Sequence, residues 1–149
     1  MSHRTMQVEA IEHGTVIDHI PSQATLRVAD LVSEPGDQVF IGVNLRSSKV
    51  GLKGVVKVAN RELPPATLSR LALIAPQATM CLIRDYKVVA KHPIPQPDSF
   101  VGVAACPNPN CVTNHERWHT RFLVIQQRPL SVRCHHCERD FPGEELSLL

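Results

Sequence analysis

Four cysteines near the C-terminal end of the chain constrain its fold more than any other feature. They form a C-x4-C pair, Cys106 and Cys111, and, after 22 intervening residues, a C-x2-C pair, Cys134 and Cys137. Two short cysteine loops of this kind can place four thiolates at the corners of a tetrahedron, each about 2.3 Å from a Zn²⁺ ion. Disulfide bonds are the weaker interpretation, because no signal peptide is recognisable and Cys81 makes the number of cysteines odd. The spacing therefore predicts one zinc site.

The predicted zinc is structural. A catalytic zinc usually keeps an open coordination position beside three protein ligands, whereas four cysteines fill the shell. A zinc hydrolase needs that open position for water and is therefore disfavoured. Nearby histidines could each replace a cysteine as ligand, but four well-spaced cysteines make this unnecessary. These histidines are His115, His119, His135 and His136.

Charge and hydropathy exclude some broad classes of protein. The net charge is +2 and 43% of the residues are hydrophobic, which is ordinary for a soluble globular protein. Residues 99–149 contain five Lys and Arg against five Asp and Glu, so a Zn²⁺ ion with four thiolates would bring this region to about −2. A zinc ribbon that binds nucleic acid needs a basic surface and is disfavoured. No apolar run is long enough to cross a bilayer, so we expect no membrane association and a cytoplasmic protein.

The proline-rich segment His92–Asp98 divides the chain. Its three prolines remove backbone donors and favour an extended, semi-stiff connection. We therefore predict a first domain over residues 1–98, including this linker, and a zinc domain over residues 99–149. About fifty residues bury too little apolar surface to fold alone, so folding of the second domain is expected to require the metal.

Hydrophobic periodicity and turn residues predict two helices and six strands in the first domain. The helices are expected over Ser22–Val32 and from Pro64 to Ala75. The strands are expected over Met6–Ile11, Thr15–Ile20, Gln38–Leu45, Gly54–Ala59, Thr79–Ile83 and Tyr86–Ala90, with a polar loop over Arg46–Lys53. This order predicts an α+β fold with an antiparallel sheet and both helices on one face, which is ferredoxin-like. The second domain is predicted to be all-β, with strands over Phe100–Ala104, Arg121–Gln126 and Leu130–Val132.

Several polar residues of the first domain have simple structural interpretations. Asp18 and His19 could form a general acid–base pair, but no nucleophile motif or paired carboxylates accompany them, so catalysis is not expected. Lys57 and Lys91 end strand-like runs, and taken alone they are solvated charges at strand ends. Cys81 lies in an apolar strand and is most simply a small core residue.

Longer motifs in the chain resemble one protein family. In sequence order they are VEAI at 8–11, GTVIDHIP at 14–21, APQAT at 75–79, YKVV at 86–89 and CPNPNC at 106–111. They extend over nearly the whole chain, and the two longest are far more specific than a bare cysteine pattern. On these residues the chain resembles the regulatory chains of aspartate carbamoyltransferase.

The resemblance implies a non-catalytic subunit that controls pyrimidine biosynthesis. In such chains CTP and UTP inhibit the enzyme and ATP activates it. The first domain would bind the nucleotide and pair with a second regulatory chain, while the zinc domain would contact catalytic chains. The resemblance also implies a role for each matching position. The base would be bound by the backbone of Val8, Glu9, Ala10 and Ile11, and the pocket would be lined by Ile83, Tyr86 and Val88. Asp18 would bind the ribose, Lys57 would reach both base and ribose, and the phosphates would be bound by His19 and Lys91.

Two positions differ from the family pattern. Cys81 stands where relatives often have Asn, and a thiol cannot make the paired hydrogen bonds of an amide. Thr5 stands where some relatives carry a lysine near a second nucleotide. These differences leave the preference among CTP, UTP and ATP open.

The first cysteine loop contains two asparagines, Asn108 and Asn110. The resemblance favours contact of both side chains with a catalytic chain. The alternative is a pair of local Asx turns that complete the cysteine loop.

Overall fold

The computed structural model describes residues 10–48 and 51–149 of the chain. Contacts divide the chain into two compact units. Of the described residues, the first unit comprises those up to Thr67 together with Gln77–Ile94, and the second comprises Leu68–Pro76 together with Pro95–Leu149. Among the described residues, no helix is both long and apolar enough to cross a membrane.

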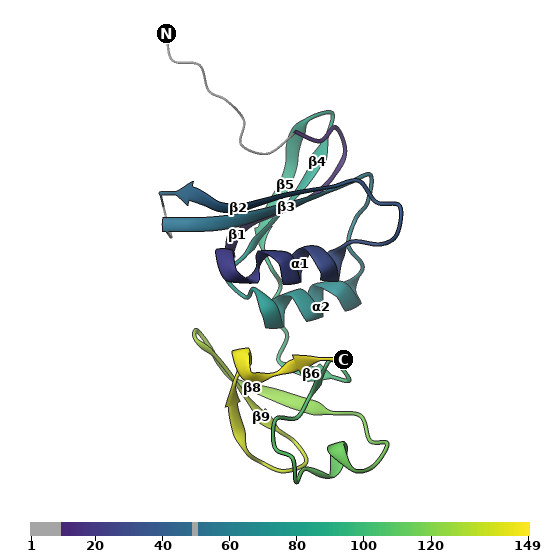
Figure 1. Cartoon of the computed structure of the whole chain (residues 1–149), viewed down its shortest axis with the longest axis vertical. Coiled ribbons are helices and arrows are strands. Elements are labelled where there is room, and N and C mark those ends of the chain that lie inside the picture. The colour runs from purple at the N-terminus through teal and green to yellow at the C-terminus, as the bar shows by residue number, and fades with distance from the viewer. Residues whose placement is uncertain (1–9, 49–50) are drawn as a thin grey trace. The chain divides into compact units, whose positions relative to one another are not determined.

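A five-stranded antiparallel sheet forms the body of the first unit (Figure 1). Its strands are β1 (Gly14–Pro21), β2 (Val39–Ser47), β3 (Gly51–Ala59), β4 (Thr79–Arg84) and β5 (Lys87–Pro93). Their spatial order is β2-β3-β1-β4-β5, so β1 is the central strand. Thr15 and Ile17 alternate along β1 with the less buried Val16 and Asp18, which distinguishes a buried face of the sheet from a more open one.

The buried face is covered by the helix α1 (Thr25–Val32), which follows a 3-10 turn, η1 (Ser22–Ala24), and packs against β2 and β3. Val28 and Val32 are fully buried at helical spacing. The helix approaches β3 closely at Gly54, where a Cβ atom would lie 1.8 Å from the Thr25 Oγ1 atom. Glycine is therefore required at this position by the packing of α1 on the sheet.

A second helix, α2 (Pro65–Ile74), connects β3 to β4 along the chain. Proline at its first position is favourable because no intrahelical hydrogen bond is lost there. Its buried residues are Leu71, Ala72 and Leu73. From Leu68 onward the helix groups with the second unit by its contacts, so α2 belongs in part to each unit.

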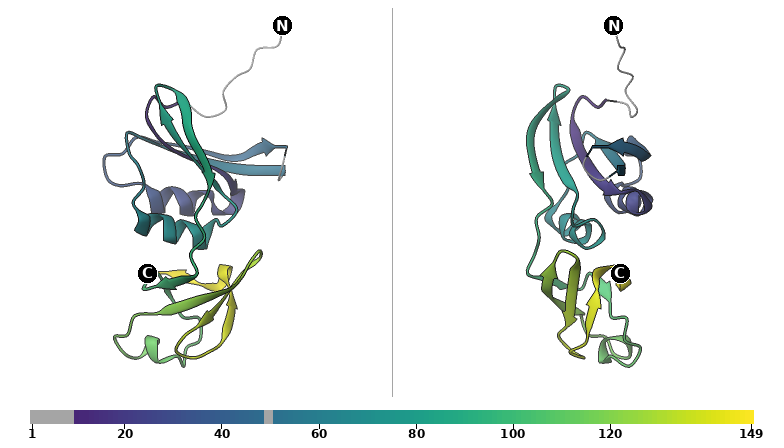
Figure 2. Two further views of the ribbon diagram at one scale, coloured as in Figure 1. Left: turned by 180° about the vertical axis from the view of Figure 1, so that it is seen from behind. Right: turned by 90° about the vertical axis from the view of Figure 1, so that its left-hand side faces the viewer.

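The second unit is a small β structure with little regular helix (Figure 2). Its main sheet contains β6 (Ser99–Val101), β8 (Arg121–Gln127), β9 (Leu130–Cys134) and β10 (Asp140–Pro142) in the order β10-β9-β8-β6. A separate pair joins β7 (Ala104–Ala105) to β11 (Ser147–Leu148), and two 3-10 turns are η2 (Val112–Asn114) and η3 (Gly143–Glu145). Phe100 and Phe122 face each other across β6 and β8 and are fully buried, so they form the centre of its core.

The predicted fold class is confirmed: an antiparallel sheet with two helices precedes a C-terminal β region that carries the four cysteines. The predicted first strand is not seen in its described part, because Ala10 and Ile11 have no strand structure, and Met6–Glu9 lie outside the described residues. The predicted polar loop over Arg46–Lys53 is wrong. The ladder of β2 and β3 continues through it to the pair Ser47 and Gly51, since backbone pairing outweighs the polarity of the side chains.

Candidate functional site

The four predicted zinc ligands come together in the second unit. Their sulfur atoms all lie within 4.8 Å of one another, with 3.8 Å between Cys106 and Cys137 and 3.8 Å between Cys111 and Cys134. A tetrahedral ion with bonds of about 2.3 Å requires its sulfur ligands to be about 3.8 Å apart, whereas a disulfide needs about 2.05 Å. The donor set and spacing thus fit one structural Zn²⁺ ion with a complete cysteine shell.

Burial of these thiols makes it unfavourable to ionise all four unless a cation lies among them. Burial raises the pKa of Cys106 and of Cys134, because thiolates are poorly solvated there. Burial also acts to raise the pKa of Cys137, but the backbone N–H of Arg139 and the Asn108 side chain stabilise its thiolate and lower the pKa to about 7. Four adjacent thiolates can therefore coexist only with a metal ion that compensates their charge.

The cysteine loops are held by hydrogen bonds around the sulfur cluster. The Thr113 hydroxyl lies 3.2 Å from the Cys111 sulfur, and the Asn114 amide donates to the carbonyls of Cys106 and Asn108 at 3.0 and 2.7 Å. Such outer contacts fix the orientation of metal ligands. The histidines lie outside the sulfur cluster: His115 and His136, for example, bond to the carbonyls of Pro109 and His119.

The two asparagines of the first loop have different environments. The Asn108 side-chain oxygen accepts a hydrogen bond of 3.0 Å from the Asn110 backbone N–H, which is a local Asx turn, and Asn108 is buried. The Asn110 side chain is exposed. Asn110 is therefore accessible to a partner chain, while the side chain of Asn108 supports the loop itself.

The open face of the first sheet gathers the polar residues predicted to bind nucleotide. The strand register aligns Phe40, Lys57, Val16, Cys81 and Lys91 in one row across all five strands. Residues paired in this way project from the same face of a sheet. The register thus places Lys57 and Lys91 on one surface, although 34 positions separate them in the sequence.

Asp18 and His19 lie beside this row at an irregularity of β1. The register of β1 and β3 shifts between Ile17 and Ile20, and His19 has a positive φ of 57°, which is unusual for a residue other than glycine. The His19 imidazole reaches the Thr79 hydroxyl at 3.3 Å. Asp18 accepts 2.8 Å and 2.6 Å bonds from the Lys53 ammonium and the His19 backbone N–H. The bulge thus directs an acid and an imidazole toward the same surface.

Apolar residues form a cluster on this surface that extends from the row to Ile83 at one end. Ile11, Cys81 and Ile83 form a buried cluster against which Val16, Phe40 and Ala59 pack. Val88 pairs with Ile83 across β4 and β5, and the backbone N–H of Tyr86 donates to the Glu12 carbonyl at 2.9 Å. Ala10 is exposed next to Ile11, whereas Val8 and Glu9 lie outside the described residues. The described residues predicted for the nucleotide therefore share one region of the first unit.

Cys81 is the cysteine that does not join the sulfur cluster. Burial raises the pKa of its thiol, Asp18 adds to this effect and Lys91 opposes it, so the thiol is protonated at neutral pH. It lies in the middle of the open-face row between Val16 and Lys91. A protonated thiol there contributes a small apolar surface and one weak donor.

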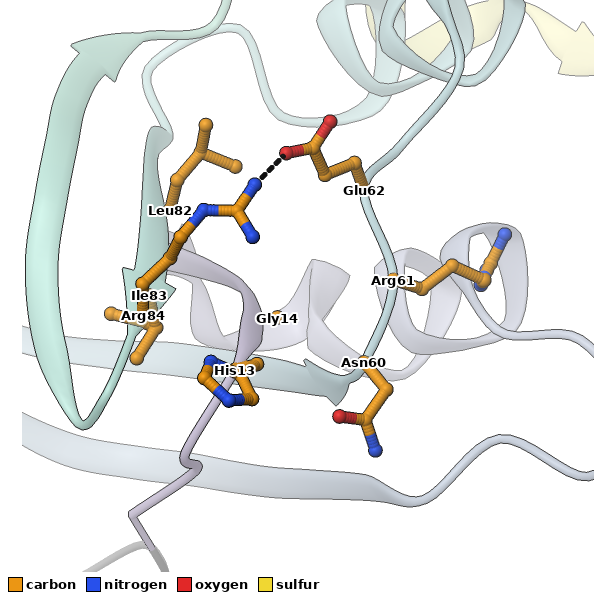
Figure 3. Close-up of a pocket in the computed structure, with 8 residues that line it drawn as sticks. All are labelled: His13, Gly14, Asn60, Arg61, Glu62, Leu82, Ile83 and Arg84. Carbon is orange, nitrogen blue, oxygen red and sulfur yellow. Dashed lines mark hydrogen bonds and ion pairs between the residues drawn. The ribbon is translucent and has the colours of Figure 1, made fainter.

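A cavity of about 410 Å³ lies at the end of the first sheet where β1 begins and β3 and β4 end (Figure 3). Its walls include His13, Gly14 and Asn60, and Ile83 is the one predicted nucleotide residue that lines it. At its rim the Arg84 guanidinium bonds to the Glu62 carboxylate at 2.9 Å. Because Arg84 and the other arginine of the lining, Arg61, are both paired with carboxylates, the cavity offers little positive charge for a triphosphate.

A second group with metal-ligand side chains, Glu12, His13 and Asp85, does not suit a metal ion. The Asp85 backbone N–H donates to His13 Nδ1 at 3.3 Å, so the ring proton lies on Nε2. That nitrogen faces the Glu12 and Asp85 carboxylates at 3.7 and 3.9 Å. The proton thus occupies the position that a metal would need.

Lys53 also projects from the open face, as a residue of β3, although the sequence predicts a polar loop over Arg46–Lys53. Its signal was the alternation of Lys53, Val55 and Lys57, which places both lysines on one face of a strand. The 2.8 Å contact with Asp18 brings its charge to the same site as His19.

We expect the Asp18–Lys53 pair to make the stability of the first unit depend on pH. Burial acts to raise the pKa of Asp18, but Lys53 and the His19 N–H outweigh it, so the pKa is lower than in the unfolded chain. The stabilisation is therefore present above the unfolded value of about 3.9 and is lost as pH falls through the folded pKa. Lys53→Met should lower the free energy of unfolding at pH 7 by about 1 kcal/mol or less, and this difference should vanish in acid. Urea denaturation at several pH values tests this, and a difference independent of pH contradicts it.

Comparison with known proteins gives matches over almost the whole chain. Residues 6–95 match the family model described as the aspartate carbamoyltransferase regulatory chain, allosteric domain, and residues 98–147 match the metal binding domain of the same regulatory chain. The regulatory chains of Thermococcus gammatolerans and Pyrococcus abyssi are each 46% identical, over 95% of both this chain and the relative. That of Porphyromonas gingivalis is 42% identical over the full length of both chains.

These matches agree with the two features that the structure shows independently. The metal-binding match covers all four clustered cysteines, and the allosteric match covers the five-stranded sheet with the row that contains Lys57 and Lys91. The sulfur cluster has a structural role, and the chain is a non-catalytic subunit of an enzyme complex. It belongs to the family of aspartate carbamoyltransferase regulatory chains.

Proposed function

We propose that the open face of the first sheet binds nucleoside triphosphates, with CTP and UTP as inhibitors and ATP as activator of aspartate carbamoyltransferase. The observation that carries this proposal is the row in which Lys57, Cys81 and Lys91 share one face with Asp18 beside it. The row supplies positive charge, a carboxylate and an apolar floor within one surface.

The charges suit the separate parts of a nucleotide. A triphosphate needs cations, and the chain has no glycine-rich phosphate loop, so Lys91, His19 and Lys53 are the groups proposed to supply the positive field. Asp18 is proposed to accept hydrogen bonds from the ribose hydroxyls, with Lys57 near the base and ribose. Lys53 must then exchange part of its contact with Asp18 for the phosphates.

The apolar end of the surface is proposed to hold the base. Ile11, Ile83 and Val88 provide flat apolar contact, with Tyr86 at the margin, and the backbone from Val8 to Ile11 is proposed to read the edge of the base. Such contacts allow a pyrimidine and a purine to share one pocket with different fits. Competition between CTP and ATP follows directly from a shared pocket.

Control of the enzyme requires coupling between this site and the catalytic chains. An effector shifts a quaternary equilibrium only through its different affinities for the two states, and couplings of about 1–3 kcal/mol are typical. We propose that this chain pairs with a second copy and joins catalytic trimers through its zinc domain, with Asn110 at the contact and Asn108 supporting the loop. The proline-rich segment 92–98 is proposed to transmit the shift. Reduced zinc thiolates suit the cytoplasm, which is the proposed compartment.

Substitution of the row lysines tests the proposed site. Lys57→Ala and Lys91→Ala should each weaken both CTP and ATP binding by about 10- to 150-fold, because each removes a charge-assisted hydrogen bond of about 1.5–3 kcal/mol. Isothermal titration calorimetry with each nucleotide measures the loss, and the zinc content should not change.

Lys87→Ala provides a matched control on the same strand. Lys87 pairs with Arg84 and therefore projects from the opposite face to Lys91. The control should keep nucleotide affinity within about twofold of the unmodified chain, as expected for a surface charge away from the ligand. Unchanged affinities in both row variants would place the effector elsewhere.

A further inference from the structure

The single tryptophan of the chain lies on the surface of the second unit. Trp118 is 54% exposed, and its ring meets the edge of the His136 ring at 5.5 Å between centroids and 78° between planes. His136 in turn contacts the His135 ring at 5.2 Å. Within the described residues the indole N–H has no hydrogen-bond acceptor. An aromatic side chain is therefore held in a defined orientation with its donor available.

Hydrogen bonds hold the backbone beside Trp118 to the second cysteine loop, between Cys134 and Cys137, and to the sheet. His136 Nε2 bonds to the His119 carbonyl at 3.1 Å, and the His135 N–H bonds to the Arg121 carbonyl at 2.8 Å. Thr120 is buried, and its hydroxyl donates to the Ala104 carbonyl at 2.5 Å. His135 and His136 are themselves the two residues between the ligands Cys134 and Cys137. Metal binding thus orders the support of Trp118 before any partner arrives.

We propose that Trp118, supported by His136 and His135, anchors the zinc domain to the catalytic chain. We call these three residues the Trp118 surface. The inference rests on the proposed function, and it names the group that carries the contact. The fitting partner is an apolar pocket with a carbonyl or carboxylate at its mouth to accept the indole N–H.

The form of the Trp118 surface favours a protein partner. Tryptophan is enriched among the few residues that dominate binding energy, and a fixed orientation avoids the entropy cost of ordering the side chain on binding. Stacking on a nucleic-acid base is disfavoured because residues 99–149 have no net positive charge, and the zinc thiolates make the region negative. The four cysteine sulfurs, which lie within 4.8 Å of one another, come from the loop that carries Asn110 and from the loop that carries His135 and His136. Both loops therefore belong to the domain proposed to meet the catalytic chain.

Association with the catalytic chain tests the anchor. The zinc-loaded full-length chain is mixed with its own catalytic chain, and complex formation is followed by sedimentation velocity over a concentration series. Trp118→Ala should weaken association at least about 30-fold, as expected for a dominant interface residue. Trp118→Phe keeps a ring and should lose less. Leu123→Ala, which removes another exposed apolar side chain of the same unit, is the control and should assemble like the unmodified chain.

Two further measurements separate the anchor from folding and from the proposed function. Zinc content and CTP affinity should be the same in all three variants, and loss of zinc in Trp118→Ala would overturn the inference by showing a role in folding. Because the chain has one tryptophan, 5-fluorotryptophan labelling gives a single ¹⁹F signal, which should shift on addition of the catalytic chain. If the unmodified chain assembles and Trp118→Ala assembles equally well, the anchor is wrong while the proposed function stands. If the unmodified chain does not assemble, or if an oligonucleotide rather than the catalytic chain shifts the signal, both are overturned.

Discussion

Removal of zinc should unfold the second unit and release the chain from its catalytic partner, while the sheet of the first unit stays folded. The ion joins two loops that are far apart in the sequence, and the core beneath them is small, with Phe100 and Phe122 at its centre. Structural zinc contributes about 10–16 kcal/mol in small domains, which exceeds the stability that about fifty residues can gain from apolar burial. Chelation or a mercurial reagent should therefore abolish the amide signals of β8 and β9 in NMR spectra and keep those of β1 and β3.

Two variants serve as controls for this prediction. Cys81→Ser removes a thiol outside the sulfur cluster, so the zinc content should stay at one ion per chain. Cys111→Ser removes a ligand and should reproduce the effect of chelation. Native protein without zinc, or amide signals of β8 and β9 that survive chelation, would show that the cysteines do not hold the fold together.

The strands and helices that follow a local sequence pattern were largely predictable. Period-two alternation found the cores of β1, β3 and β4, and helical spacing with flanking prolines found α1 and α2. The strands β10 and β11 have three and two residues, so they are too short to carry a period and form through pairing with segments distant in sequence. The extension of β2 and β3 through polar residues was missed because ladder hydrogen bonds do not depend on side-chain polarity.

The sequence predicts more of the zinc site than of the proposed nucleotide site. The zinc ligands follow from spacing alone, because the chemistry of four thiolates leaves few alternatives. The open-face row depends on the register of five strands, because this register places Lys57 and Lys91 on the same face of the sheet. No local sequence pattern encodes that register. The contact between Lys53 and Asp18 needed the bulge at Ile17–Ile20, which brings Asp18 within reach of a lysine two pairs along β3.

Gly14→Ala should destabilise the first unit by about 3 kcal/mol or more. Gly14 begins the central strand with a φ of +140°, and a Cβ atom there would lie 2.1 Å from the Val58 carbonyl oxygen. The strain of an unfavourable φ costs about 1–3 kcal/mol, and overpacking adds about 1–3 kcal/mol. A carbonyl of the β3 backbone cannot rotate away as a side chain can, so β1 and β3 must separate at this end.

Gly36→Ala separates the effect of backbone strain from the effect of the steric clash of the Cβ atom. Gly36 also has a positive φ, +90°, but a Cβ atom there would meet nothing within 4 Å, so we expect a loss of only about 1 kcal/mol. Urea denaturation monitored through first-unit amides compares the two variants. Because Gly14 pairs with Ile83, Gly14→Ala should also weaken CTP and ATP binding under conditions where the variant is still folded, whereas Gly36→Ala should not. Equal losses of stability in both variants would mean that β3 yields easily at Val58, and that the end of the sheet nearest the proposed base pocket is not held rigidly by the pairing of β1 with β3.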